Sequence, residues 1–186
     1  IEYNKTFFLM ESTKSKVNNL LKNKSLLWIN TKHAKNLFNK NIWVKTVMFT
    51  KKFPDTLQIS ILEYSAIAYF KKNKLIYLIN DNFKNSLIDN NGNLENLIEV
   101  KNMKNMKDFK TFFLKITNED VFFSKIKVIN YVHDGRWDVV LKNGQLIKLG
   151  NYNLNKQVKY LNFILNNQTA KIIDLRYEGR VILANE

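Results

Sequence analysis

The chain has 186 residues, no cysteine and a formal net charge of +14, with 45% hydrophobic and 25% charged residues. This length allows one domain or two small ones with a real core, and the ordinary hydrophobic content excludes a globally disordered protein. The lack of cysteine excludes a disulfide framework, a thiol nucleophile and a cysteine-based zinc site, and no apolar run approaches the ~20 residues of a membrane-spanning helix.

The basic charge has three explanations. A basic surface can bind nucleic acid or anionic lipid headgroups, and a composition rich in Lys and Asn can also arise from AT-rich coding alone. Asparagine is abundant although it adds no charge, and the lysines are scattered along the chain. Both observations favour the compositional explanation, so we expect no nucleic-acid partner.

The first seventy residues predict the order strand, helix, helix, strand, strand. Residues 6–10 are apolar and predict the first strand. Apolar residues at helical spacing predict one helix around residues 17–21 and a second around residues 34–38. Each follows residues that can cap the N-terminus of a helix.

Residues 43–70 give the strongest local pattern. A β-prone run over residues 43–49 precedes Pro54 and Asp55, a pair typical of a β-turn. Apolar and polar residues then alternate over residues 57–61, as in a half-buried strand. This stretch therefore predicts a β-hairpin.

After about residue 69 the pattern changes to short strands separated by turns. Strands are predicted at residues 74–80, 121–132, 136–141 and 145–149, and a strand end at 87–88 runs into an Asn-Gly turn. A second Asn-Gly pair, at 143–144, is a strong hairpin signal. Residues 153–166 predict a helix, and 171–177 predict a strand that 181–183 continue. The structure between residues 93 and 120 is left open.

The sequence contains no recognisable catalytic motif. Its two histidines, His33 and His133, have no third metal ligand at helical spacing, and neither Glu63 nor Asp89 is paired by the pattern with a second carboxylate. Glycine-rich phosphate loops, GxSxG and HExxH are absent. We expect no enzymatic activity, no cofactor and no metal site.

Three blocks of the chain resemble the FtsQ/DivIB family of cell-division proteins. Residues 43–70, WVKTVMFTKKFPDTLQISILEYSAIAYF, are similar to the hairpin that ends the family's POTRA domain, a β-α-α-β-β module. The second block joins the turn at 87–92 to residues 134–150, DGRWDVVLKNGQLIKLG, and the third is residues 171–183, which contain DLRY. Together the blocks cover most of the chain in the family's order, with a shortened middle segment.

The resemblance implies an α+β protein of two domains. Residues 1–69 would form the POTRA domain, and residues 70–186 a β-rich domain with a mostly antiparallel sheet and flanking helices. The implied function is that of a non-catalytic divisome scaffold at the division septum, on the periplasmic side of the inner membrane. The implied anchor is an N-terminal helix that precedes this chain.

The resemblance also implies the partners. In this family the last strand of the β-domain takes up the periplasmic segment of FtsB, which arrives with FtsL, by strand addition, and the POTRA domain contacts other division proteins. Carried over by motif, the partner-binding residues are Arg176, Tyr177, Gly179, Val181 and Ile182, together with Arg136 before the family's tryptophan. The competing interpretation gives Arg176 and Tyr177 a purely structural place in the core.

Two other functions stay open from the sequence. One is a basic nucleic-acid-binding α/β protein, which the net charge favours. The other is a POTRA-containing module of an outer-membrane assembly or secretion system. The blocks around residues 134–150 and 171–183 do not repeat the POTRA pattern, and they favour the division protein.

Overall fold

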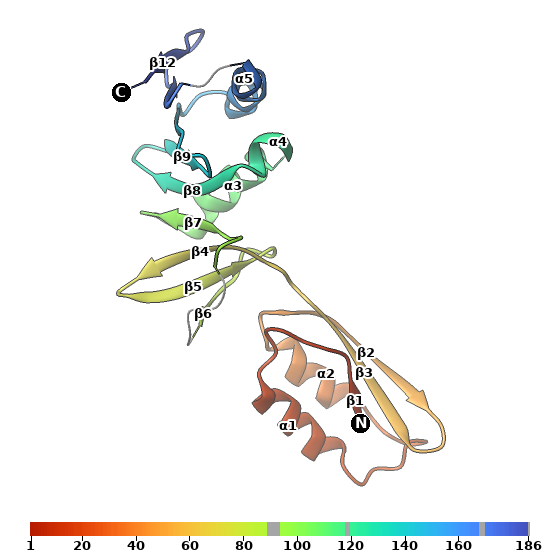
Figure 1. Cartoon of the computed structure of the whole chain (residues 1–186). Helices are drawn as coiled ribbons and strands as arrows, with labels where there is room; N and C mark the ends of the chain where they lie inside the picture. The colour runs from red at the N-terminus through yellow and green to blue at the C-terminus, as the bar shows by residue number, and fades with distance from the viewer. Residues whose placement is uncertain (89–93, 118–119, 168–169, 186) are drawn as a thin grey trace. The chain divides into compact units, whose positions relative to one another are not determined.

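The computed structural model describes residues 1–88, 94–117, 120–167 and 170–185, which form two compact units (Figure 1). Unit 1 comprises Ile1–Ala66 and Asn80–Ser86, and unit 2 comprises Ile67–Ile79 and Leu87–Glu186. The predicted boundary after residue 69 separates the two domains of the family, which is a different division from these two units. It stays a prediction.

Unit 1 has the predicted β-α-α-β-β order and a sheet of strand order β1–β3–β2. Its elements are β1 (Glu2–Tyr3), α1 (Glu11–Leu21), α2 (Lys32–Asn39), β2 (Val44–Lys52) and β3 (Thr56–Glu63). The first strand, which pairs parallel to β3, lies before the predicted residues 6–10. Those residues instead form a bend, because the Glu63 carboxylate accepts the N–H groups of Phe7, Phe8 and Leu9 at 2.6–3.0 Å.

The predicted hairpin is confirmed. Strands β2 and β3 pair antiparallel from Val44–Glu63 to Lys52–Thr56, and a turn containing a cis Phe53–Pro54 bond joins them. Helices α1 and α2 present their apolar residues, at the predicted spacing, to one face of this hairpin. The resulting core contains Val17, Leu21, Ala34, Phe38, Val47, Leu57, Ile59 and Ile61.

The second sheet has nine strands in the order β12–β11–β10–β9–β8–β7–β4–β5–β6, mainly within unit 2. Its strands are β4 (Ala66–Lys72), β5 (Leu75–Asn80), β6 (Asn85–Ile88), β7 (Ile98–Lys101), β8 (Ile126–Tyr131), β9 (Trp137–Leu141), β10 (Leu146–Leu149), β11 (Ile172–Leu175) and β12 (Ile182–Ala184). The sheet is mostly antiparallel, because short turns join most neighbours. Parallel pairing occurs at β4–β7, β7–β8 and β10–β11.

Among its described residues, unit 2 has the helices α3 (Met106–Ile116), α4 (Asp120–Phe123) and α5 (Leu154–Asn167). The chain reaches β8 from β7 through α3 and α4, and it reaches β11 from β10 through α5 (Figure 1). The ring of Phe112 on α3 stacks on Trp137 of β9 with centroids 4.8 Å apart. Side chains of β9, β10 and β11 on this covered face are fully buried at the paired positions Val139, Ile147 and Ile173.

The structure describes most of the segment that the sequence left open, apart from residues 93, 118 and 119, and it shortens one predicted strand. Residues 98–101 and 106–116 form β7 and α3, whose Asn105 side chain accepts the N–H of Asp108 at 2.8 Å. The strand predicted at 121–132 begins only at Ile126, after α4. The Asn-Gly turn predicted at 91–92 lies outside the described residues.

Candidate functional site

The six residues predicted to bind a partner fall into two places. Five follow β11, in its turn to β12 and at the start of β12: Arg176, Tyr177, Gly179, Val181 and Ile182. Arg136 precedes β9, and β10 and β11 lie between β9 and β12 in the sheet order. The prediction that 181–183 continue the preceding strand is wrong, because the chain turns back and β12 pairs antiparallel with β11.

The β11–β12 turn depends on a glycine. Gly179 has φ +72°, and a Cβ added there would meet no atom within 4 Å. Its backbone conformation, which L side chains rarely adopt, rather than a lack of space, is therefore what requires glycine. The Arg180 N–H donates to the Tyr177 carbonyl at 3.2 Å and closes the turn.

Tyr152, which the sequence analysis did not single out, attaches this turn to the segment before α5. Its hydroxyl lies 2.9 Å from the carbonyl oxygens of both Leu175 and Tyr177, to either of which it can donate. Burial raises the pKa of this phenol, with smaller contributions from the charges of Glu178 and Asp174. The hydroxyl therefore stays protonated and able to donate at neutral pH.

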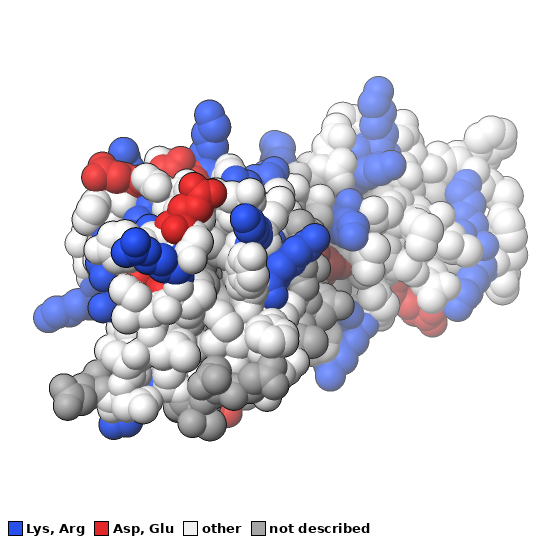
Figure 2. All heavy atoms as spheres, turned by 90° about the horizontal axis from the view of Figure 1, so that it is seen from above, with Lys and Arg blue, Asp and Glu red and all other residues white. Residues whose placement is uncertain are grey.

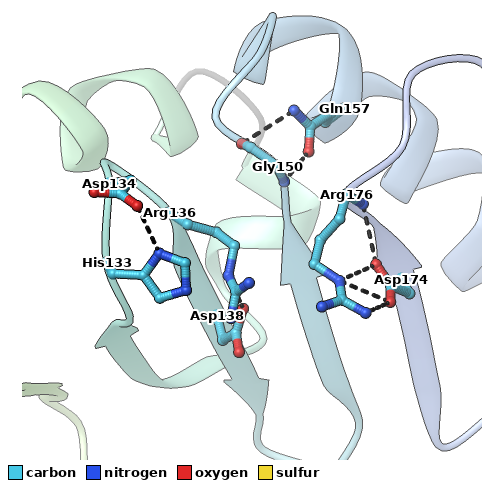
Figure 3. A network of polar contacts seen from close by, with 8 residues as sticks. All are labelled: His133, Asp134, Arg136, Asp138, Gly150, Gln157, Asp174 and Arg176. Atoms are coloured by element: carbon cyan, nitrogen blue, oxygen red, sulfur yellow. Dashed lines mark hydrogen bonds and ion pairs between the residues drawn. The ribbon is translucent and has the colours of Figure 1, made fainter.

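The first residue of the turn is held by its own strand. The Arg176 guanidinium donates from Nε to both carboxylate oxygens of Asp174 at 2.9 Å and from Nη2 to Oδ2 at 2.5 Å, and the Arg176 N–H donates to Oδ1 at 3.0 Å (Figure 3). Burial alone would raise the pKa of Asp174, but the hydrogen bonds and charge of Arg176 lower it below its ordinary value. We call this pair the Asp174–Arg176 fork.

The fork belongs to a row of alternating charges across the sheet. Asp138 of β9, Lys148 of β10 and Asp174 of β11 occupy paired positions. Arg136 Nε lies 3.8 Å from Asp138 Oδ1, and neither atom has a hydrogen-bond partner among the described residues. Burial raises the pKa of Asp138, although Arg136, Lys148 and Arg176 act against the rise. Arg136 thus faces its own strand neighbour.

Strand β12 lies at one end of the sheet order and pairs with β11 along one side only, as far as the described residues go. Its exposed side chains are apolar, with Ile182 49% and Leu183 42% exposed, and Val181 just before it is 42% exposed. Tyr177 in the turn is 54% exposed. An edge of this kind offers unpaired backbone groups together with apolar contacts for an added strand.

A cavity of about 190 Å³ adjoins the turn. It lies between the start of α5 and the turn, and its lining includes Tyr152, Lys156, Tyr160, Glu178 and Val181. Aromatic walls with two basic residues, Lys156 and Arg180, and one acidic residue, Glu178, suit an apolar or amphipathic side chain of a peptide. The cavity reaches Val181, the residue before β12, so we treat the cavity and the β12 edge together as the candidate site.

The residues considered for chemistry lie in ordinary surroundings. His133 Nδ1 lies 3.0 Å from Asp134 Oδ2 in an exposed turn, and Glu63 binds backbone N–H groups. Asp89 lies outside the described residues. Within the described part of the chain, no three potential ligands gather in a way that could hold a metal ion.

On the one face of the described residues that Figure 2 shows, the basic side chains do not gather into one stripe. On the face shown in Figure 2, lysines and arginines are spread over the surface, with acidic side chains among them and uncharged surface between. A nucleic-acid site normally concentrates its basic residues. In the described parts of the chain, no helix is both long and apolar enough to cross a membrane.

Two family models match the chain. Residues 14–64 match the model described as "POTRA domain, FtsQ-type", and residues 77–176 match "Cell division protein FtsQ/DivIB, C-terminal". The second match covers more than half of the chain and includes β9, β10 and β11. It does not reach β12 or most of the turn.

Proteins named cell division protein FtsQ are similar to this chain in sequence. The cell division protein FtsQ of Rickettsia conorii is 26% identical over 175 residues, and that of Rickettsia bellii is 28% identical over 175 residues. Each alignment covers 91% of this chain, which spans 65% of the length of these relatives. The extracytoplasmic domain of DivIB from Geobacillus stearothermophilus, at 12% identity, aligns with 58% of this chain and 99% of its own at a TM-score of 0.40, a likeness too weak to carry a conclusion.

Proposed function

This chain belongs to the FtsQ/DivIB family of cell-division proteins, and from that premise we propose that it is a non-catalytic scaffold that binds an FtsB-type partner by strand addition at β12. The partner segment would pair along the free edge of β12 and place side chains against Tyr177, Val181 and Ile182. An FtsL-type protein would arrive with it. The complex would link these partners to septal cell-wall synthesis.

One observation carries this proposal: β12 is a terminal strand whose accessible side chains are apolar. Soluble proteins normally protect such an edge by charge, proline or cover. Here the exposed run is short and adjoins a cavity, so a partner strand gains both backbone hydrogen bonds and a side-chain pocket. Among the described residues, no cluster of catalytic groups points to an enzymatic function instead.

We propose different roles for the six predicted residues. Tyr177, Val181 and Ile182 are exposed and are proposed to touch the partner. Gly179 shapes the turn through its positive φ, and Arg176 holds the turn through Asp174. Arg136, beside Asp138 and with 22% of its side chain exposed, would contribute to the charge that a partner meets near the start of β9.

The same premise supports the location and the domain plan. We infer a POTRA domain over residues 1–69 and a β-domain over residues 70–186, held on the periplasmic side of the inner membrane at the septum by a helix outside this chain. In unit 1, β2 is an outer strand of its sheet. This edge is a second proposed docking place, for other members of the divisome.

The test is calorimetric titration of the chain with the periplasmic segment of the FtsB-type protein from the same organism. Saturable binding is expected for the wild type, and its loss for a Tyr177→Ala, Val181→Glu double variant. A matched control is Leu87→Glu, which places a charge on β6, the opposite terminal strand of the same sheet, where the side chain is 43% exposed. The control should bind like the wild type.

Two results would reject the site. Folded wild-type protein that binds no segment would remove the strand-addition proposal, and the next titration would use nucleic acid at low salt, where a basic protein binds most tightly. Equal binding by the double variant and the control would move the partner away from β12. Circular dichroism of each variant establishes that it is folded.

A further inference from the structure

The loop between α1 and α2 places large apolar side chains in solvent. Of its four successive apolar residues, Leu26 and Ile29 pack against the core of unit 1, whereas Leu27 is 63% and Trp28 86% exposed. Tryptophan is highly buried on average. The inward pair anchors the loop to the core, and the outward pair is left exposed to solvent.

The turn of the β2–β3 hairpin lies beside this loop. Lys51 Nζ donates to the Leu27 carbonyl at 3.0 Å and so ties the end of β2 to the loop, and both lie at one end of unit 1 (Figure 1). Phe53, two residues after Lys51, is 65% exposed. We call Leu27, Trp28 and Phe53, with Lys22, Lys24, Lys51 and Lys52, the tip patch.

Lysines outnumber acidic residues in the tip patch. Four exposed lysines flank its apolar side chains in the sequence: Lys22, Lys24, Lys51 and Lys52. The acidic groups nearby are Asp55, whose carboxylate accepts the Thr56 hydroxyl at 2.9 Å, and Glu2, whose carboxylate lies 3.7 Å from Lys52 Nζ. The patch thus combines projecting apolar groups with a local excess of positive charge.

We propose that the tip patch docks on the surface of a phospholipid bilayer that carries anionic headgroups. Indole and other apolar side chains favour the region between headgroups and acyl chains. Lysine side chains can lay their stems along apolar surface and keep the ammonium group among the headgroups, where the negative surface potential attracts it. This contact uses unit 1 and is independent of β12.

Position and charge favour a membrane over a protein partner. Protein hot spots are typically aromatic residues that enter well-packed pockets, with charged residues depleted around them. Here the aromatic side chains stand on a loop and a turn, and lysines accompany them on both segments. Anionic lipid complements both parts of this patch.

The chain offers a direct spectroscopic test. Of its three tryptophans, Trp43 and Trp137 are only 5% and 4% exposed, whereas Trp28 is 86% exposed. Vesicles of phosphatidylcholine with phosphatidylglycerol should shift the Trp28 emission to the blue, and brominated lipid should quench it. Vesicles of phosphatidylcholine alone should produce a much smaller change, because the lysines then gain no attraction.

Variants separate the tip patch from the overall charge of the protein. In vesicle co-sedimentation, Leu27→Ser combined with Trp28→Ala should weaken binding by about tenfold or more, because it removes the inserted groups. Phe163→Ala, which removes a 71% exposed aromatic ring on α5, should bind like the wild type. Lys22→Gln with Lys24→Gln should lose affinity for anionic vesicles, whereas Lys104→Gln with Lys159→Gln, at exposed positions in unit 2, should not.

Three results would overturn the proposal. The first is no emission shift with anionic vesicles. The second is equal loss of binding in both lysine pairs, which would assign the attraction to net charge. The third is evidence of self-association without vesicles. In that case the emission shift would depend on protein concentration, and sedimentation would show an oligomer for the wild type that is absent in Trp28→Ala. Failure of FtsB-type binding leaves each of these measurements unaffected, so the two proposals fail separately.

Discussion

The Asp174–Arg176 fork makes a specific prediction about the β11–β12 turn. Asp174→Asn keeps the size of the side chain and removes the charge that accepts three side-chain contacts at 2.5–2.9 Å. The carboxylate side chain is 8% exposed and the arginine side chain 33% exposed. Arg176 would therefore lose its main partner while part of its guanidinium can still be solvated.

The size of the effect follows from this geometry. A hydrogen bond to a charged group contributes about 1.5–3 kcal/mol, and the solvent access of Arg176 reduces the total well below the sum of three. We expect a loss of about 2 kcal/mol in the free energy of unfolding, equivalent to a fall in Tm of about 4–8 °C. Urea unfolding followed by circular dichroism measures it.

The loss should depend on pH in one direction. The folded-state pKa of Asp174 lies below its ordinary value, so its contribution is fully present above about pH 4 and declines as the pH falls through the folded-state pKa. The difference between wild type and variant should persist at pH 5 and shrink in more acidic buffer. Asp134→Asn, in an exposed pair with His133, is the control. If Asp174→Asn is no less stable than this control, the fork does not hold the turn.

Three further predictions concern other contacts. Glu63→Gln should speed hydrogen exchange of the Leu9 amide and destabilise unit 1 by about 1–3 kcal/mol, because the carboxylate accepts three backbone N–H groups; unchanged exchange would contradict this. Gly150→Ala should weaken partner binding, since its Cβ would lie 2.8 Å from the Tyr152 ring that anchors the turn, and equal affinity in calorimetry would count against that anchor. Burial, then the Glu11 charge, raises the pKa of Tyr3 to about 12. The free energy of unfolding should therefore fall between about pH 10 and 12, where the unfolded phenol ionises first, and Tyr3→Phe should lack this part of the fall. A Tyr3 phenol that titrates with the exposed tyrosines would refute this prediction.

The regular parts of the fold were accessible from sequence because local patterns and tertiary packing agree there. The alternation over residues 57–61 matches inward and outward positions of β3. The Asn-Gly pair at 143–144 lies between β9 and β10, and Gly144 has φ +89°. Helix α5 covers nearly the range predicted from its spacing. In each case one short pattern specifies both the element and the buried face.

The first strand and the last turn were not accessible because long-range contacts decide them. Residues 6–10 are apolar enough for a strand, but the Glu63 carboxylate, more than fifty positions away, takes the N–H groups that a strand neighbour would use. Residues 171–183 read as one β-prone run. Gly179, Asp174 and Tyr152 together bend it into a hairpin, and no local pattern connects Tyr152 with that turn.

The candidate site combines a fixed turn with an incomplete strand. The turn is held from one side by Asp174 and from the other by the Tyr152 hydroxyl, whereas β12 has three residues and one described neighbour. A binding segment that is ordered beforehand loses less conformational entropy on association. Because the turn already fixes where β12 begins, an added strand would mainly supply the hydrogen bonds and apolar contacts that β12 lacks. Under the proposed strand addition, changes to the fork should weaken binding even though the Asp174 side chain is only 8% exposed, whereas changes at Ile182 should weaken binding with little loss of stability.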